Sequence, residues 1–235
     1  MTDSKIRLVT FDLDDTLWHT APVIARAEQS LQDWLLQRAP QLGLMTLERL
    51  QQLRKRVLQR MPQIAHSVSE IRFQVLRLAY LDAGDTPEQA ATLAEEAFQH
   101  FLGERQKVEV SPTVRPILQV MRKQGYMLGA LSNGNADVRR VGLGDCFDFA
   151  LSADALGVGK PDVAAFRAAL GRGGVEPQQA AHVGDNPHDD IAGALAAGMH
   201  AIWFNPTGAE WQAGEPPTAQ ISCLSQLPDV LADLM

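Results

Sequence analysis

Acidic side chains gather in two short segments of the sequence, and each segment follows an apolar stretch. Asp12 and Asp14 come directly after residues 6–11, which are typical of a buried strand, and Asp185 and the doublet at 189–190 follow a second apolar stretch. Taken singly, each segment is equally well explained as an acidic turn or a helix cap. If the two segments share one crevice, the repulsion between their carboxylates in a partly dry site amounts to several kcal/mol. A bound cation would relieve that repulsion, and an all-oxygen ligand set suits Mg²⁺ better than Zn²⁺.

Three further polar residues stand where they could bind a phosphate group. Ser132 and Asn133 follow a predicted strand and precede a predicted helix, where side chains and backbone N–H groups bind phosphate oxygens well. Capping of that helix explains them equally well. Lys160 would offset the charge of a phosphoryl group if it lies beside the acidic segments, but by itself it is typical of a solvated loop. It does not belong to a P-loop, because Pro161 stands where that motif requires Ser or Thr.

The elements that must position these residues alternate between strand and helix beyond residue 112. Short apolar runs predict strands at 126–131, 149–151, 182–183, 201–204 and 221–222. Amphipathic spacing predicts helices at 114–123, 137–143, 163–170, 191–197 and 224–234. This alternation predicts a parallel sheet covered by helices on both faces. Ligands of such sheets lie outside the carboxyl ends of the strands, so we expect the acidic, hydroxyl and lysine side chains to converge there.

Residues 22–106 show a different pattern, which is helical throughout. Apolar residues recur there at steps of three and four in four successive stretches, and no strand is predicted among them. Breaks fall at 40–43, at 61–62 and at Gly84. The segment 86–89, Thr-Pro-Glu-Gln, is a helix start with the residues of a capping box. The sequence therefore predicts a helical module inserted after the first strand.

The composition is that of a globular protein and excludes several classes. The 235 residues are 46% hydrophobic with a formal net charge of −7, which excludes a disordered chain and argues against a general nucleic-acid binder. No apolar run approaches the ~20 residues of a membrane helix, and we see no signal peptide, so we expect a cytoplasmic protein. Cys146 and Cys223 are expected to be free thiols. His188 is a candidate to line the site, whereas the other histidines, including His182, are expected to be structural or on the surface.

Four stretches of the chain together resemble a known family. They are Phe11–Leu17, Leu131–Asn135, Gly159–Pro161 and Val183–Asp190. In this order they resemble the four signature motifs of the haloacid dehalogenase-like (HAD) hydrolase superfamily, and the likeness extends over the whole chain. The resemblance implies an α/β fold with a Rossmann-like parallel-sheet core, residues 1–18 and 108–235. It also implies that residues 19–107 form an inserted four-helix-bundle cap over the active site.

The resemblance implies catalytic and metal-binding roles as well. Asp12 would be the nucleophile and a Mg²⁺ ligand, and Asp14 the general acid and base, with its backbone carbonyl on the metal. Lys160 would orient the nucleophile and offset charge. Asp185 would bind Mg²⁺ directly, and Asp190 would lie just outside the direct ligands. Its neighbour at 189 is the alternative, but the small residues that follow favour Asp190.

The resemblance further implies a phosphatase, because dehalogenases of this fold lack the second aspartate and need no acid to protonate an alkoxide. The substrate-binding candidates are Thr16, Ser132, Asn133, Trp18, His19 and Arg72. The fuller pattern is similar to that of the bacterial subgroup acting on flavin mononucleotide and on 5-amino-6-(5-phosphoribitylamino)uracil. Alternatives are specificity for a nucleotide, phosphoglycolate or a sugar phosphate, or a phosphorylatable regulatory protein, which has no use for the helical insert. We expect Mg²⁺ as cofactor, a small phosphorylated metabolite as substrate, no nucleic-acid or membrane partner, and a monomer or homodimer.

Overall fold

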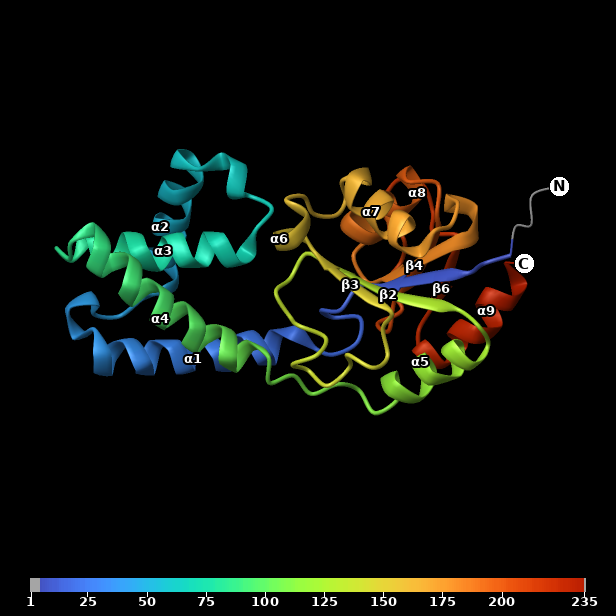
Figure 1. Ribbon diagram of the computed structural model, residues 1–235, viewed down its shortest axis with the longest axis horizontal. Helices are drawn as coiled ribbons and strands as arrows, with labels where there is room; N and C mark the ends of the chain where they lie inside the picture. The colour runs from blue at the N-terminus through green and yellow to red at the C-terminus, as the bar shows by residue number, and fades with distance from the viewer. Residues whose placement is uncertain (1–4, 235) are drawn as a thin grey trace. The chain divides into compact units, whose positions relative to one another are not determined.

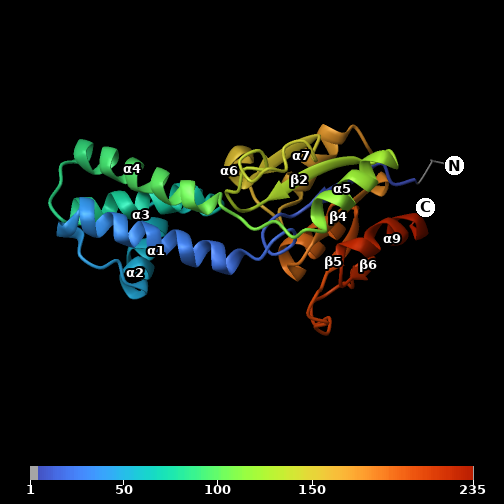
Figure 2. The ribbon, with the colours of Figure 1, turned by 90° about the horizontal axis from the view of Figure 1, so that it is seen from below.

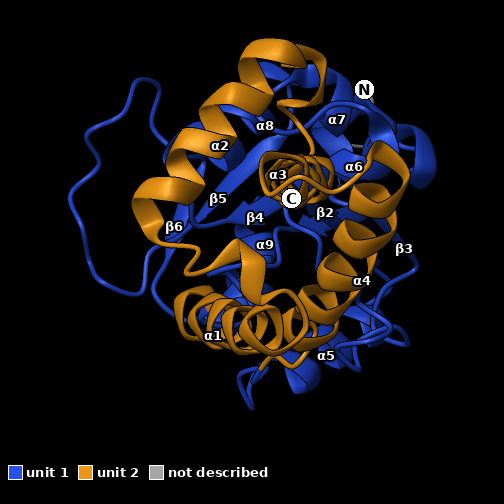
Figure 3. Ribbon diagram, turned by 90° about the vertical axis from the view of Figure 1, so that its left-hand side faces the viewer, with its two compact units in different colours: residues 1–19, 109–235 blue, residues 20–108 orange. Residues whose placement is uncertain are grey.

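The computed structural model describes residues 5–234, and the chain divides into two compact units (Figure 3). Unit 1 consists of residues 1–19 and 109–235, and unit 2 consists of residues 20–108. Unit 2 is therefore a single continuous segment that interrupts unit 1 between its first strand and the remaining ones. Each unit has a hydrophobic core of its own.

Unit 1 contains a six-stranded sheet in which every neighbouring pair is parallel. The strands are β1 (Leu8–Phe11), β2 (Met127–Ser132), β3 (Phe149–Ser152), β4 (Ala180–Gly184), β5 (His200–Phe204) and β6 (Ala219–Ile221). Their order across the sheet is β3-β2-β1-β4-β5-β6. All residues of β1 and β4 are buried, which explains why their sequences are mainly apolar, with Thr10 and His182 as the polar members, rather than alternating.

Helices cover both faces of this sheet (Figures 1 and 2). Helices α5 (Val114–Lys123) and α9 (Leu227–Asp233) lie on one face, and α7 (Val163–Gly173) and α8 (Gly193–Ala196) lie on the other. The predicted α/β class and parallel sheet are confirmed. The glycine- and proline-rich segment between β5 and β6 forms the extended loop seen at the bottom of Figure 2.

Two of the predicted helices in unit 1 differ from the structure. Residues 137–142 form turns rather than a helix, because the Asp137 carboxylate accepts a hydrogen bond from Arg139 N at 2.8 Å and Gly142 takes a positive φ of 83°. The helix predicted at 191–197 instead begins at Pro187 as a π-helix, Pro187–Ala192, which α8 continues. Asn186 O accepts from both residue 190 and residue 191, which widens the turn. The sequence also gave no signal for the one-turn helix α6 (Ala153–Leu156).

Unit 2 is built from four α-helices: α1 (Thr20–Arg38), α2 (Leu47–Arg60), α3 (Val68–Asp82) and α4 (Pro87–Arg105). Short 3-10 turns at Pro40–Leu42 and Pro62–Ile64 mark two of the predicted breaks. At the start of α4 the predicted capping box is present: Gln89 N donates to Thr86 Oγ1 at 3.3 Å and Thr86 N to Gln89 Oε1 at 3.0 Å. Helix α4 packs along both α1 and α3. Among residues 5–234, no helix has the length and apolar character needed to cross a membrane.

Candidate active site

The acidic segments converge at the carboxyl ends of β1 and β4, where the strand order reverses. Parallel sheets of this order bind ligands at that point, because the connections leave in opposite directions and open a crevice. Asp12 N continues the ladder by donating to Val183 O at 2.9 Å, which fixes the first residue after β1 against the last residues of β4. Carboxylate oxygens of Asp12, Asp185 and Asp190 all lie within 4.8 Å of one another. The sheet therefore places three carboxylates in one cluster.

Lys160 neutralises part of this cluster. Its Nζ donates to Asp12 Oδ1 and to Asp190 Oδ1, each at 2.6 Å, and the Lys160 side chain is only 2% exposed. The loop that carries the lysine is held by Asn133, whose Oδ1 accepts from Lys160 N and whose Nδ2 donates to Lys160 O, both at 2.8 Å. Asn133, predicted as a substrate-binding residue, thus clamps the lysine backbone in this structure.

Asp190 is the buried member of the acidic doublet. Beyond Lys160, its Oδ2 accepts from Asn186 N at 2.9 Å, and its Oδ1 lies 3.1 Å from His182 Nε2. Its neighbour Asp189 is half-buried and instead accepts from His188 Nδ1 at 2.9 Å, with its Oδ2 3.4 Å from Asn133 Nδ2. His188 is itself 77% exposed. The structure therefore brings Asp190, rather than Asp189, to the lysine and to the other two carboxylates.

Burial and the neighbouring charges shift the pKa values of the residues in this cluster. Burial raises the pKa of Asp12 to about 8, against the effect of the Lys160 ammonium and with that of the Asp190 carboxylate. Burial also raises the pKa of Asp185 to about 6, and the Asp190 charge adds to this. Burial alone would raise the pKa of Asp190, but Lys160 and His182 bring it below its ordinary value. Burial would likewise lower the pKa of Lys160, but Asp12 and Asp190 raise it.

A tight turn after β1 positions the second aspartate of the first segment. Asp15 adopts a left-handed conformation with φ of 60°, which aspartate tolerates better than most residues, and Asp15 N donates to Trp18 O at 2.9 Å. The turn brings Trp18 back so that its indole Nε1 donates to Asp14 Oδ1 at 3.0 Å. Thr16 Oγ1 donates to Asp185 Oδ1 at 3.1 Å and so joins the two acidic segments. Trp18 and Thr16, predicted to bind substrate, contact the acidic residues themselves.

Ser132 lies at the end of β2, the strand next to β1, and is 3% exposed. Its Oγ accepts from Gly134 N at 3.0 Å, which leaves the hydroxyl hydrogen to point elsewhere. This is an ordinary serine turn after a strand, and it also suits a hydroxyl that donates to a phosphoryl oxygen.

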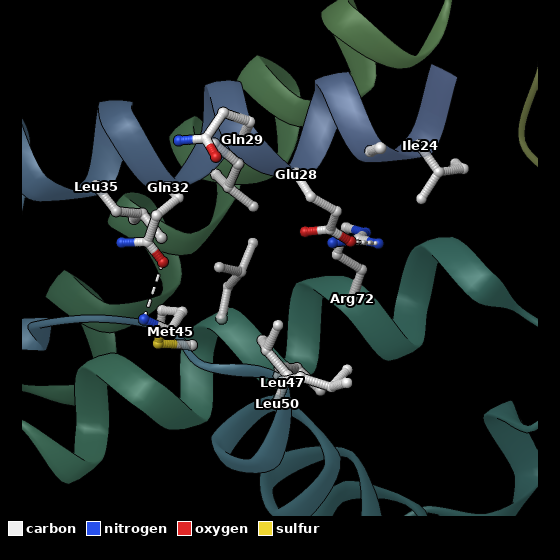
Figure 4. A pocket seen from close by; sticks show the side chains of 13 residues that line it. Ile24, Glu28, Gln29, Gln32, Leu35, Met45, Leu47, Leu50 and Arg72 are labelled. Carbon is white, nitrogen blue, oxygen red and sulfur yellow. Dashed lines mark hydrogen bonds and ion pairs between the residues drawn. The ribbon is translucent and has the colours of Figure 1, made fainter. Parts of the chain in front are cut away.

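The remaining two predicted substrate residues are His19 of unit 1 and Arg72 of unit 2. His19 is exposed at the end of the first segment of unit 1. Arg72 belongs to unit 2, where its guanidinium contacts Glu28 Oε1 at 2.6 Å and lies 3.6 Å from the centroid of the Phe101 ring. Figure 4 shows Arg72 and Glu28 facing each other at one end of a pocket of about 480 Å³ among α1, α2 and α3. The other walls of that pocket are mainly apolar, with Leu35 and Leu50 among them.

One buried residue at the site was missed from the sequence. His182, expected to be structural or on the surface, is fully buried in β4 with its ring beside Asp190. The available signal was a polar residue inside an apolar strand, at the same level as Thr10 in β1, with which it is in register. Asn186 was also missed: besides its N–H bond to Asp190, its Oδ1 accepts from the N–H groups of residues 188 and 189.

Comparisons with known proteins find relatives that cover most of this chain. The chain is 34% identical over 231 residues, 97% of both chains, to the 5-amino-6-(5-phospho-D-ribitylamino)uracil phosphatase YigB of Escherichia coli. It is 40% identical over 139 residues, 57% of this chain and 54% of the other, to the phosphoserine phosphatase of Thermus thermophilus. A crystal structure described as a 2-haloacid dehalogenase from Pseudomonas syringae is 52% identical, covers 98% of this chain and 100% of its own, and superposes with a TM-score of 0.95. The haloacid dehalogenase-like hydrolase family matches residues 6–198, and with the buried aspartate–lysine cluster in place this chain belongs to that family of hydrolases.

Proposed function

We propose that this protein is a Mg²⁺-dependent phosphate monoesterase that forms an aspartyl-phosphate intermediate on Asp12. The observation that carries the proposal is the position of Asp12 at the end of β1, with Lys160 Nζ 2.6 Å from one of its oxygens and Asp14 two residues further on. This arrangement supplies a carboxylate nucleophile, a fixed cation beside it and a second carboxyl group for proton transfer.

In the first step an oxygen of Asp12 attacks phosphorus, and the bond from phosphorus to the ester oxygen breaks. The leaving alkoxide takes the proton of the Asp14 carboxyl group, so that an alcohol departs. In the second step the Asp14 carboxylate accepts a proton from water, the resulting hydroxide attacks phosphorus, and the bond between Asp12 and phosphorus breaks. Lys160 orients Asp12 and offsets charge throughout, and Ser132 donates its hydroxyl to the phosphoryl group.

The residues present fit a Mg²⁺ ion. The three clustered carboxylates and one ammonium leave two excess negative charges in a buried site, which matches a divalent cation. Both oxygens of Asp190 already accept hydrogen bonds from protein donors, whereas Asp12 and Asp185 each keep an oxygen without a donor among the described residues. Asp12, Asp185 and the Asp14 backbone carbonyl would hold the ion, with Asp190 outside the direct ligands. When bound, it would neutralise the anionic site and favour the ionised form of Asp12.

Unit 2 fits the role of a cap, with residues 19–107 as the inserted domain. Its place in the chain supports this role. One connection follows the first catalytic segment, a few residues after Asp12, and the other leads into the segment before β2. A cap that closes would exclude bulk water from the aspartyl phosphate. Arg72, at the end of the unit 2 pocket, is our candidate for a residue of the cap that contacts the substrate.

For the substrate we propose a phosphate of the riboflavin pathway, either 5-amino-6-(5-phosphoribitylamino)uracil or flavin mononucleotide. The similarity to YigB over nearly the full length of both chains supports this choice. Phosphate release should be measured with Mg²⁺ over these two compounds, phosphoserine, phosphoglycolate, a nucleoside monophosphate and a sugar phosphate. We expect the highest kcat/KM for one of the first two, loss of activity in EDTA, and loss of turnover without unfolding in Asp12→Asn. Normal rates in EDTA or in Asp12→Asn would contradict the mechanism.

A second candidate function is dehalogenation of a 2-haloacid, favoured by the description of the Pseudomonas syringae structure. In that reaction Asp12 would displace a halide, which leaves without a proton, so Asp14 would have no part in the first step. The two functions are separated by offering the protein 2-chloropropionate and measuring chloride release. We expect none; chloride release at a rate comparable to phosphate release would favour the dehalogenase.

A further inference from the structure

Two polar side chains lie inside the buried centre of the sheet and form a hydrogen-bonded pair. Thr10 of β1 and His182 of β4 are both 0% exposed and stand opposite each other in the register of these strands. Thr10 Oγ1 lies 2.8 Å from His182 Nδ1, and Nε2 of the same ring lies 3.1 Å from Asp190 Oδ1. The ring is held edge-on against Phe166 of α7, with the centroids 5.2 Å apart and an interplanar angle of 88°. The imidazole therefore has a fixed orientation between a hydroxyl and a carboxylate.

The partners of the ring determine which of its nitrogens carries hydrogen. An ionised Asp190 can only accept, so His182 Nε2 must carry the hydrogen that it donates to Oδ1. A second hydrogen on Nδ1 would place another buried cation beside Lys160, and burial already lowers the pKa of His182. Nδ1 is then an acceptor, and the Thr10 hydroxyl donates to it. The structure thus predicts a neutral ring in its Nε2–H tautomer, selected by Asp190 and supported by the hydroxyl of Thr10, which lies on the strand just before Asp12.

His182 and Lys160 donate to the same oxygen, Oδ1 of Asp190. Asp190 Oδ1 accepts from both His182 Nε2 and Lys160 Nζ, while Oδ2 accepts from Asn186 N. Three donors from different segments therefore fix this carboxylate in one orientation. Since Lys160 Nζ lies 2.6 Å from both Asp190 Oδ1 and Asp12 Oδ1, the place of the ammonium beside Asp12 depends on how Asp190 is held. Loss of a partner that orients a charged group in this way typically costs about 10- to 100-fold in activity.

We propose that His182 is a positioning residue for the reaction: as an Nε2–H donor, oriented by Thr10, it fixes Asp190 and through it holds Lys160 against the nucleophile Asp12. This inference rests on the proposed phosphatase function for its kinetic consequences, but the tautomer and its dependence on Thr10 do not. It assigns a function to the pair inside the sheet, which neither binds substrate nor reacts.

The test compares a variant without the Nε2–H donor, a variant that keeps an N–H donor, and a variant in which the ring loses its bond to Thr10. His182→Leu removes both ring nitrogens, and His182→Gln keeps an N–H donor at the distance of Nε2. Thr10→Val removes the hydroxyl that donates to Nδ1. The control is His100→Leu in unit 2, since His100 is also partly buried, hydrogen-bonded to Ser30 Oγ at 2.8 Å and stacked on an indole ring. Circular dichroism and urea unfolding establish which variants fold.

We expect His182→Leu to lower kcat by about 10- to 100-fold, with KM changed by no more than about twofold. His182→Gln should recover at least half of the loss in log kcat that His182→Leu causes. If the ring only filled space, restoring an N–H donor would not recover kcat. Thr10→Val should lower kcat less, and it should add nothing to His182→Leu, because the two residues act through one bond. His100→Leu should leave kcat unchanged.

The independent measurement is a long-range ¹H–¹⁵N spectrum of the wild-type protein with labelled histidine. We expect His182 to show hydrogen on Nε2, and Thr10→Val to weaken that preference. An Nδ1–H tautomer, wild-type kcat in folded His182→Leu, or a folded His182→Gln no more active than His182→Leu would each overturn the proposal. If His182→Leu does not fold, Thr10→Val and the spectrum decide. A wild-type protein that releases no phosphate from any ester would refute the proposed function, and the spectra would still decide the role of the pair.

Discussion

Replacing Lys160 with methionine tests the electrostatic description of the site directly. Methionine has a similar length and fills the same space, so Lys160→Met removes the charge and the two 2.6 Å hydrogen bonds with little change in packing. The variant leaves the carboxylates of Asp12 and Asp190 facing each other with no cation between them. Their side chains are only 12% and 1% exposed, so water cannot replace the ammonium.

The expected loss of stability follows from this burial. Removing one partner of a buried ion pair destabilises a protein by about 3–5 kcal/mol, because the remaining charge stays desolvated. This loss is about one third of the free energy of unfolding of a typical domain, which is about 5–15 kcal/mol. Asp12, whose pKa is already raised to about 8 with the lysine present, should bind a proton in the variant over most of the accessible pH range.

The sign of the pH dependence is fixed by proton binding. A carboxyl group whose pKa is higher in the folded state than its unfolded value of 3.8 binds more protons folded than unfolded between those two values. Stability therefore falls as the pH rises through that interval, by at most about 1.4 kcal/mol per pH unit for each proton. Wild-type Asp12 also holds a proton up to about pH 8, so through this group both proteins lose stability alike below that pH. Metal-free Lys160→Met should fall furthest below wild type above about pH 8, where Asp12 ionises beside Lys160 but stays protonated without it.

The assay is urea unfolding of metal-free protein in EDTA at several pH values, followed by a signal from unit 1. Lys123→Met is the matched control, since Lys123 lies exposed in the last turn of α5 in the same unit. We expect the control to change the free energy of unfolding by less than about 0.5 kcal/mol at every pH. A loss in Lys160→Met below about 1 kcal/mol, or a loss that does not depend on pH, would refute the picture of a buried carboxylate pair that depends on this lysine.

Three further outcomes are expected. Gly184→Ala should lower kcat strongly while the protein still folds, because a Cβ there would lie 2.2 Å from Asp190 Cγ and must displace that side chain; a steady-state assay with circular dichroism checks this, and normal kcat would contradict it. Tyr80→Phe should leave the stability of unit 2 unchanged or raise it by up to about 1 kcal/mol, because the buried Tyr80 hydroxyl has no hydrogen-bond partner among the described residues; thermal unfolding is the measurement, and a clear loss would reveal a partner. Asp82→Asn should destabilise the protein by less than about 1 kcal/mol, since the bond from Arg56 lowers the pKa of an exposed Asp82. The difference in stability between variant and wild type should disappear as the pH falls below about 4, and a larger loss in urea unfolding would argue against solvent screening.

Much of the fold could be predicted from the sequence, because its signals are local. The mainly apolar runs of β1 and β4, the alternation of strands with helices, and the capping box at Thr86 each depend on residues close together in the chain. The order of the strands then brings the ends of β1 and β4 together, so the convergence of Asp12, Lys160 and Asp185 was predictable at the level of a shared crevice.

The details of the site depend on contacts that no local pattern encodes. The helix predicted at 137–143 is absent because glycines and the Asp137 side chain favour turns, and the π-helix at Pro187–Ala192 depends on the doubly accepting carbonyl of Asn186. The small residues after Asp190 favoured it over Asp189 in the sequence, but the contacts that distinguish the two residues arise only once that helix exists. His182 was missed for a related reason: a histidine in a strand acquires a partner only when the sheet and the following helix are assembled.

Thr10 of β1 and Asp12, the proposed nucleophile that directly follows β1, lie in one short segment of the chain. From Thr10 the contacts pass through His182, Asp190 and Lys160 and return to Asp12, two residues further along the chain. A ring of this kind resists rotation of any one member, because each side chain is held by partners on both sides. Burial, together with the Asp190 charge, raises the pKa of Asp12, so this rigidity is gained in a site that disfavours the ionised form of Asp12. In the proposed reaction a divalent cation would favour the ionised form without breaking the ring, since Asp12 and Asp185 each keep an oxygen without a donor among the described residues. An acidic protein would in this way be able to bind an anionic ester.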